Sequence, residues 1–147
     1  YWEMKFWDLG CAESPEDKAG MLFWRMHRCA RIIVSLKFHL GTMTPAEMID
    51  FLVLRVGHEK MGATSEVRRY INGSYGPLYQ AGYMIGGLQF RTLNKEMVGS
   101  GKMTEREFHD SILMGGEMPV SVVRTRLMKQ TPDINLPAEW KFYDFAK

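Results

Sequence analysis

The sequence has few cysteines and lacks a long apolar run. Its two cysteines, Cys11 and Cys29, do not form the spacing of a disulfide framework or a zinc ribbon. Cys29 lies within an apolar helical pattern, so we expect a buried thiol and a reducing compartment, the cytoplasm unless a signal peptide lies upstream of Tyr1. No apolar run reaches the roughly eighteen residues of a membrane span, and no basic stretch followed by an apolar one opens the chain.

The chain also lacks an excess of charge of either sign. It has 19 Lys and Arg against 17 Asp and Glu, a formal net charge of +2. A nucleic-acid-binding surface usually shows as a clear basic excess. We therefore expect no nucleic-acid partner and no partner selected by bulk charge.

Strand-like alternation is absent, whereas helix starts are clearly marked. "SPED", "TPAE" and "TERE" each place a Ser or Thr at an N-cap, with an acidic residue three positions later in the arrangement of a capping box: Ser14, Thr44 and Thr104. The spacing of apolar residues, and of the Gly and Pro that interrupt them, predicts these helices: about 15–40, 45–56, 64–71, 77–98, 104–114 and 119–129. An earlier short helix, Trp2 to Leu9, ends at Gly10. The predicted class is all-α.

One long helix dominates this irregular multi-helix arrangement. Its apolar residues recur at three- or four-residue steps: Leu22, Met26, Cys29, Ile33, Leu36 and Leu40. After residue 129 the chain is expected to form an extended, aromatic-rich C-terminal strap. We expect a single helical domain over residues 1–147, cut from a larger protein because its first residues already follow a helical pattern.

His58 and Glu59 begin like the zinc-peptidase signature H-E-x-x-H. That signature needs a second His at i+4, because two imidazoles on one helix face hold the metal. Gly62 occupies that position. We therefore interpret His58 and Glu59 as a solvated helix terminus.

Several stretches together resemble a known bacterial family. The order and spacing of these segments extend over most of the chain: "YWE", "CARIIVSLKFHLGTMTPAEMIDFL", "EVRRYI", "PLYQAGYMIGGL" and "EFHDSILMGGEMPV". They are similar to the C-terminal part of domain of unknown function 885, a group of predicted helical zinc metallopeptidases. Within this likeness, Ser35 stands where the family pattern has Asp, and Gln80 falls one place from the family's Gln.

The resemblance implies roles for a few residues. Glu3 would be the counterpart of a zinc-ligand glutamate, Tyr83, Tyr70 and His39 would act in catalysis, and Arg69 would anchor a substrate carboxylate. The implied cofactor is zinc and the implied partners are a peptide substrate and an upstream part of the same protein. That upstream part would carry the family's His-Glu helix, which this sequence lacks. The chain alone is therefore expected to be inactive.

Other interpretations remain open from the residues themselves. One is a non-catalytic helical binding or scaffold module that lacks a complete metal site. Another is a helical interaction protein whose Met and aromatic surface binds a partner helix. His39 also has a structural interpretation, near the carbonyls at the end of a long helix, as does His109 in hydrogen bonds to a neighbouring turn.

Overall fold

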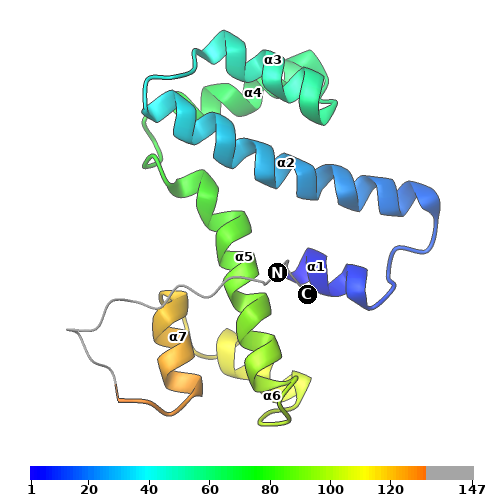
Figure 1. Cartoon of the computed structure of the whole chain (residues 1–147), viewed down its shortest axis with the longest axis vertical. Coiled ribbons are helices and arrows are strands. Elements are labelled where there is room, and N and C mark those ends of the chain that lie inside the picture. The colour runs from blue at the N-terminus through cyan, green and yellow to red at the C-terminus, as the bar shows by residue number, and fades with distance from the viewer. Residues whose placement is uncertain (132–147) are drawn as a thin grey trace. The chain divides into compact units, whose positions relative to one another are not determined.

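The computed structural model describes residues 1–131, and this part of the chain is all-helical, as predicted (Figure 1). Its helices are α1 (Trp2–Asp8), α2 (Pro15–His39), α3 (Pro45–Val56), α4 (Lys60–Ile71), α5 (Tyr79–Met97), α6 (Glu105–Leu113) and α7 (Val120–Leu127). The long helix α2 has 25 residues. The predicted aromatic strap lies outside the described residues. None of the described helices is long and apolar enough to cross a membrane.

The predicted helix starts are confirmed where a capping box marks them. Ser14, Thr44 and Thr104 each accept a hydrogen bond from the backbone N–H three residues later, and the acidic side chain at that position accepts one from the cap residue. These bonds satisfy backbone donors that a helix N-terminus otherwise leaves free. The end of α3 is likewise determined by a nearby residue. Gly57 follows its last residue and takes a left-handed conformation with φ of 83°, which ends the helix.

Helix α4 begins at Lys60, earlier than the predicted residue 64. The side chain of Glu59 accepts a hydrogen bond from the backbone N–H of Gly62 at 3.0 Å and acts as the N-cap. Gly62 therefore lies inside the first turn. A glycine that favours an interruption in the sequence is accommodated because the cap and the tertiary contacts of α4 stabilise the turn.

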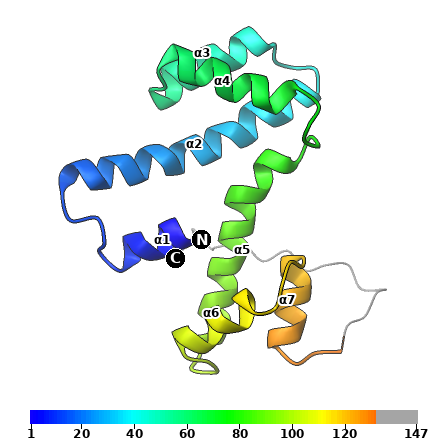
Figure 2. The same ribbon diagram turned by 180° about the vertical axis from the view of Figure 1, so that it is seen from behind.

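The described chain divides into two compact units. The larger one, Trp2–Met84, contains α1 to α4 and the first residues of α5. Helices α3 and α4 lie side by side against α2 in both views (Figures 1 and 2). Their shared core consists of these buried residues: Ala30, Val34, Met48, Leu52, Val56, Ala63, Val67 and Tyr70.

The buried face of α2 differs from the predicted apolar stripe. Leu22, Met26 and Ile33 are 42% to 47% exposed, and Cys29 is exposed as well. The expectation of a buried Cys29 thiol is therefore wrong. Helices α3 and α4 instead cover the adjacent face, where the small Ala30 and Val34 allow close helix packing. This face also carries polar residues that the apolar pattern could not indicate: His27, Arg31 and Ser35.

The second unit contains Tyr1 and the described residues from Ile85 onward. Its core is formed by Leu93 and Met97 of α5, Phe108 of α6 and Val123 of α7, all at most 3% exposed. The buried Arg124 is neutralised by Glu96. Nε2 of His109 lies 2.9 Å from the hydroxyl of Tyr1, so its partner comes from the start of the chain and not from a neighbouring turn.

Candidate functional site

Arg31 lies on the buried face of α2, at the centre of the candidate site. The residue is only 4% exposed. Its guanidinium carbon is 4.2 Å from the ring centre of Tyr83 on α5 and 5.9 Å from that of Tyr70 on α4, within the range of cation–π attraction. Its Nε donates a hydrogen bond of 3.1 Å to Oε1 of Gln80. We call Arg31, Gln80, Tyr70 and Tyr83 the Arg31 cluster.

Glu66 of α4 adjoins the Arg31 cluster and joins three side chains. Its Oε2 accepts hydrogen bonds of 2.6 Å from both the Tyr70 hydroxyl and Nη2 of Arg69, and lies 3.6 Å from Nε2 of His27. The contact with His27, together with the bonds from Tyr70 and Arg69, lowers the pKa of Glu66 far below its ordinary value. Burial and the bond to Glu66 raise the pKa of Tyr70. Tyr70 is therefore a protonated donor whose hydrogen is already engaged.

His27 and His58 form a pair that was not predicted from the sequence. Nδ1 of the buried His27 lies 2.7 Å from Nε2 of His58, so one imidazole donates and the other accepts. Burial, and then the neighbouring His27, lower the pKa of His58. His58 is thus half-buried and bonded, and the prediction that it is solvated is wrong, although Glu59 does mark a helix terminus. No local motif points to His27.

Glu3 of α1 is bound by Arg28 of α2. Nε of Arg28 donates a 2.7 Å bond to Oε2 of Glu3, and Nη2 contacts Oε1, so the pair is bidentate. The bond from Arg28 lowers the pKa of Glu3 below its ordinary value. The same guanidinium lies 5.7 Å from the ring of Tyr83. Arg28 therefore connects Glu3 to the Arg31 cluster.

Tyr83 also continues into a row of half-exposed tyrosines. The hydroxyls of Tyr79 and Tyr83 are 3.0 Å apart, and the rings of Tyr75 and Tyr79 stack with centres 4.0 Å apart. The three residues are 37% to 42% exposed. Part of this row comes from the "NGSYG" stretch before α5. The row presents hydroxyl donors and aromatic faces beside two arginines, Arg28 and Arg31.

The structure brings four of the five predicted site residues into one connected set of contacts: Glu3, Arg69, Tyr70 and Tyr83. The fifth, His39, is not part of it, because its Nδ1 lies 2.8 Å from the backbone oxygen of Ser35, one turn earlier in α2. The residues that make the connection, Arg28, Arg31 and Glu66, were not predicted as site residues. The catalytic and ligand roles of the five residues stay predictions.

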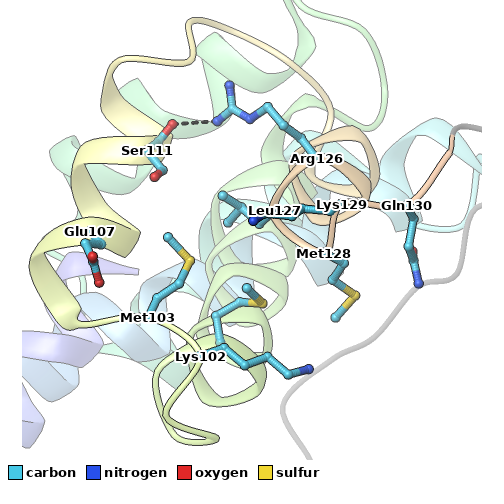
Figure 3. A pocket seen from close by; sticks show the side chains of 10 residues that line it. Lys102, Met103, Glu107, Ser111, Arg126, Leu127, Met128, Lys129 and Gln130 are labelled. Atoms are coloured by element: carbon cyan, nitrogen blue, oxygen red, sulfur yellow. Dashed lines mark hydrogen bonds between the residues drawn. The ribbon is translucent and has the colours of Figure 1, made fainter.

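Each unit also has a surface cavity. One of about 510 Å³ lies beside Glu3 and is lined in part by Phe6, Ala12 and Trp24. Another, of about 660 Å³, lies in the second unit between α6 and the end of α7 (Figure 3). There Arg126 donates a hydrogen bond to the backbone oxygen of Ser111 at 2.5 Å. Neither cavity was predicted from the sequence.

The described residues do not form a metal site by themselves. No group of three or more His, Cys, Asp or Glu side chains within residues 1–131 has the geometry to hold a metal ion. His27, His58 and Glu66 are neighbours of metal-ligand type. His27, however, uses one ring nitrogen toward His58 and the other toward Glu66, so the three side chains do not converge on one point.

Comparison with known proteins places the chain in a family. Residues 1–127 match the family model described as "Bacterial protein of unknown function (DUF885)". No curated protein and no solved structure matches the chain. The family match covers every described helix, from α1 to α7. The chain therefore belongs to the bacterial DUF885 family.

Proposed function

We propose that the chain is the C-terminal portion of a zinc-dependent peptidase, in which it supplies Glu3 and one wall of the substrate cleft. One observation supports this more than any other. Glu3 binds Arg28, Arg28 lies against Tyr83, and Tyr83 covers Arg31. A carboxylate, part-exposed tyrosines, the part-exposed cation of Arg28 and the buried cation of Arg31 thus occur together in one unit, and such polar groups could orient a peptide.

The described residues, 1–131, do not fit a zinc ion by themselves. A catalytic zinc takes three protein ligands and keeps one position open, whereas Glu3 is a single carboxylate already bound by Arg28. Two histidines and a general base would have to come from an upstream part of the protein. When bound, zinc would activate water for attack on a peptide carbonyl.

The chain's own residues would position the peptide. Tyr83 is 42% exposed and its hydroxyl bonds only to that of Tyr79 among the described residues, so it is the better placed donor to a peptide oxygen. Tyr70 is buried and engaged by Glu66. The charge of Arg69 is already paired with the same carboxylate, which makes Arg69 a weaker candidate than an unpaired arginine for binding a substrate carboxylate.

A non-catalytic binding module is the second candidate. The bidentate Arg28 pair favours it, since Glu3 is already neutralised and would have to leave Arg28 to bind a metal. Under this interpretation Glu3 fixes α1 against α2, and the tyrosine row binds a partner without chemistry. The two candidates differ in whether Glu3 affects zinc affinity.

A zinc-binding measurement tests the proposal. The reading frame upstream of Tyr1 is sequenced, and the whole encoded protein is produced as wild type, Glu3→Ala and the matched control Glu13→Ala, whose carboxylate is exposed. Zinc affinity is measured by chelator competition and peptide hydrolysis by product release. We expect Glu3→Ala to weaken zinc binding by about tenfold or more, as loss of a ligand should, and Glu13→Ala to leave it unchanged.

Two results would contradict the peptidase proposal. The first is a reading frame that encodes no His-Glu helix upstream of Tyr1. The second is a zinc affinity that is equal in wild type and Glu3→Ala. In either case the binding-module candidate would replace it.

A further inference from the structure

The guanidinium of Arg31 has no carboxylate partner among the described residues. No Asp or Glu oxygen of residues 1–131 lies within 4.0 Å of its nitrogens. The other buried arginine, Arg124, does have a partner in Glu96. A charge that is removed from water without a counter-ion is strongly unfavourable. Arg31 is therefore the exception that needs an explanation.

A second polar group beside Arg31 is also incomplete. Gln80 is 2% exposed, and its Oε1 accepts the bond from Arg31 Nε. Its Nε2 is buried and has no hydrogen-bond partner among the described residues. A buried amide donor without an acceptor has an unfavourable free energy similar to that of a lost hydrogen bond. Two adjacent side chains are thus incomplete: among the described residues Arg31 lacks a carboxylate partner, and Gln80 Nε2 lacks an acceptor.

We propose that Arg31 and Gln80 form a binding site for a carboxylate group supplied by a ligand. A carboxylate has the single negative charge that the site requires. Arg28 is neutralised by Glu3 and Arg69 by Glu66, so the Arg31 cluster has a single uncompensated positive charge. A monoanion with two coplanar oxygens matches one guanidinium, whereas a phosphate dianion would leave a negative charge buried.

Tyr83 controls access to this site. Its ring covers the guanidinium at 4.2 Å and is itself 42% exposed, so it separates Arg31 from solvent. Turning Tyr83 aside admits the ligand to Arg31. The neighbouring Tyr79 and Tyr75 then present aromatic faces and hydroxyls to the rest of the molecule. The carboxylate is that of a peptide C-terminus or of a small free acid, and the two sources are distinguishable by experiment.

Ser35 is an uncharged neighbour of Arg31. It lies one turn after Arg31 on α2 and is 2% exposed. Residues at i and i+4 are neighbours on a helix surface, so an Asp there would pair with Arg31. Ser35 instead donates a hydrogen bond of 3.4 Å to the backbone oxygen of Pro77. The missing internal counter-ion leaves Arg31 available to an external one.

A substitution at Ser35 provides the sharpest test. Ser35→Asp places a carboxylate beside Arg31, and Ser35→Asn is the matched control of equal size without charge. Both are prepared in the 147-residue chain with wild type and Arg31→Met, and folding is checked by circular dichroism and thermal unfolding. The probes for calorimetric titration are acetyl-Ala-Ala with a free C-terminus, its C-terminal amide, acetate and inorganic phosphate.

We expect wild type and Ser35→Asn to bind the free-acid dipeptide at least about tenfold more tightly than its amide. We expect Ser35→Asp and Arg31→Met to bind the free-acid dipeptide at least about tenfold more weakly than wild type does. Without ligand, Ser35→Asp should unfold at a higher temperature than Ser35→Asn, because it neutralises Arg31. Tighter binding of dipeptide than acetate assigns the site to a peptide C-terminus, and equal binding assigns it to small acids.

Three outcomes would overturn the proposal: no binding of dipeptide or acetate to wild type, equal affinity of Ser35→Asp and Ser35→Asn, or tighter binding of phosphate than of dipeptide. The test needs neither zinc nor catalysis. It therefore succeeds or fails independently of the proposed peptidase function.

Discussion

His27 and His58 are 31 residues apart in the chain, yet their facing ring nitrogens, Nδ1 and Nε2, are only 2.7 Å apart. The contact links the middle of α2 to the turn before α4. It also links this turn to Glu66, which His27 approaches with its other nitrogen. Because imidazoles titrate near neutral pH, the contact makes the stability of this unit dependent on pH.

The pKa of His58 is lowered in the folded chain, so folding disfavours its protonated form. The stabilisation is present above the ordinary histidine pKa of about 6.5 and is lost as pH falls through the lower folded value, because the unfolded chain then binds more protons. We expect the urea midpoint to fall between pH 7.5 and 5.5 in wild type and to fall less in His58→Gln. His39→Gln is the control, since His39 is exposed on α2. An equal fall in His58→Gln and wild type would exclude His58 as the cause.

Glu66 makes the folding stability depend on pH in a second, more acidic range. Its pKa is strongly lowered from the ordinary 4.5, so its stabilisation is present above about that pH and is lost as pH falls further. Glu66→Gln leaves His27, Arg69 and Tyr70 without their shared carboxylate. We expect a loss of about 1–2 kcal/mol in unfolding free energy at pH 7 and a weaker dependence of stability on pH below 4.5. Urea unfolding at several pH values measures both. If stability falls with acid equally in Glu66→Gln and wild type, Glu66 is not the cause of the fall. The control is Glu13→Gln, because Glu13 is exposed.

The core beneath the Arg31 cluster depends on α3. Leu52 is fully buried, whereas Leu54 on the same helix is 80% exposed. We expect Leu52→Ala to lower the unfolding free energy by about 2–5 kcal/mol, since it removes buried methyl groups and leaves a cavity. Leu54→Ala should change it by less than about 0.5 kcal/mol. Chemical denaturation of the pair measures the difference, and similar values would show that the packing of α3 is assigned incorrectly.

Local features of the sequence were enough to predict most of the helices. The caps at Ser14, Thr44 and Thr104 satisfy backbone groups within one turn, so neighbouring residues determine where these helices begin. The start of α4 was placed too late because Gly62 was interpreted as an interruption. Its cap, Glu59, is not a usual N-cap residue, and only its bond to Gly62 reveals that role.

Features that depend on distant residues were harder to predict. The apolar steps of α2 from Leu22 to Ile33 indicated a helix correctly but not its buried face, which is set by the packing of α3 and α4. Arg31 meets Gln80, 49 residues later in the chain, and neither was predicted as a site residue. The family likeness drew attention to Tyr70, Tyr83 and Arg69, whose roles stay predictions. Their connection through Glu66 and the buried Arg31 could be seen only in the structure.

The most direct test of the account is to observe the arginine side chains during ligand binding. In the isotope-labelled chain, nuclear magnetic resonance separates the side-chain signals of Arg28, Arg31 and Arg69, which are assigned by substitution to Lys. On titration with acetyl-Ala-Ala as the free acid, we expect the Arg31 guanidinium signals to shift to saturation, and the Arg69 signals to stay because Glu66 already binds that side chain. Unchanged Arg31 signals, or a saturating shift at Arg69 alone, would contradict the assignment of Arg31 as the carboxylate-binding residue.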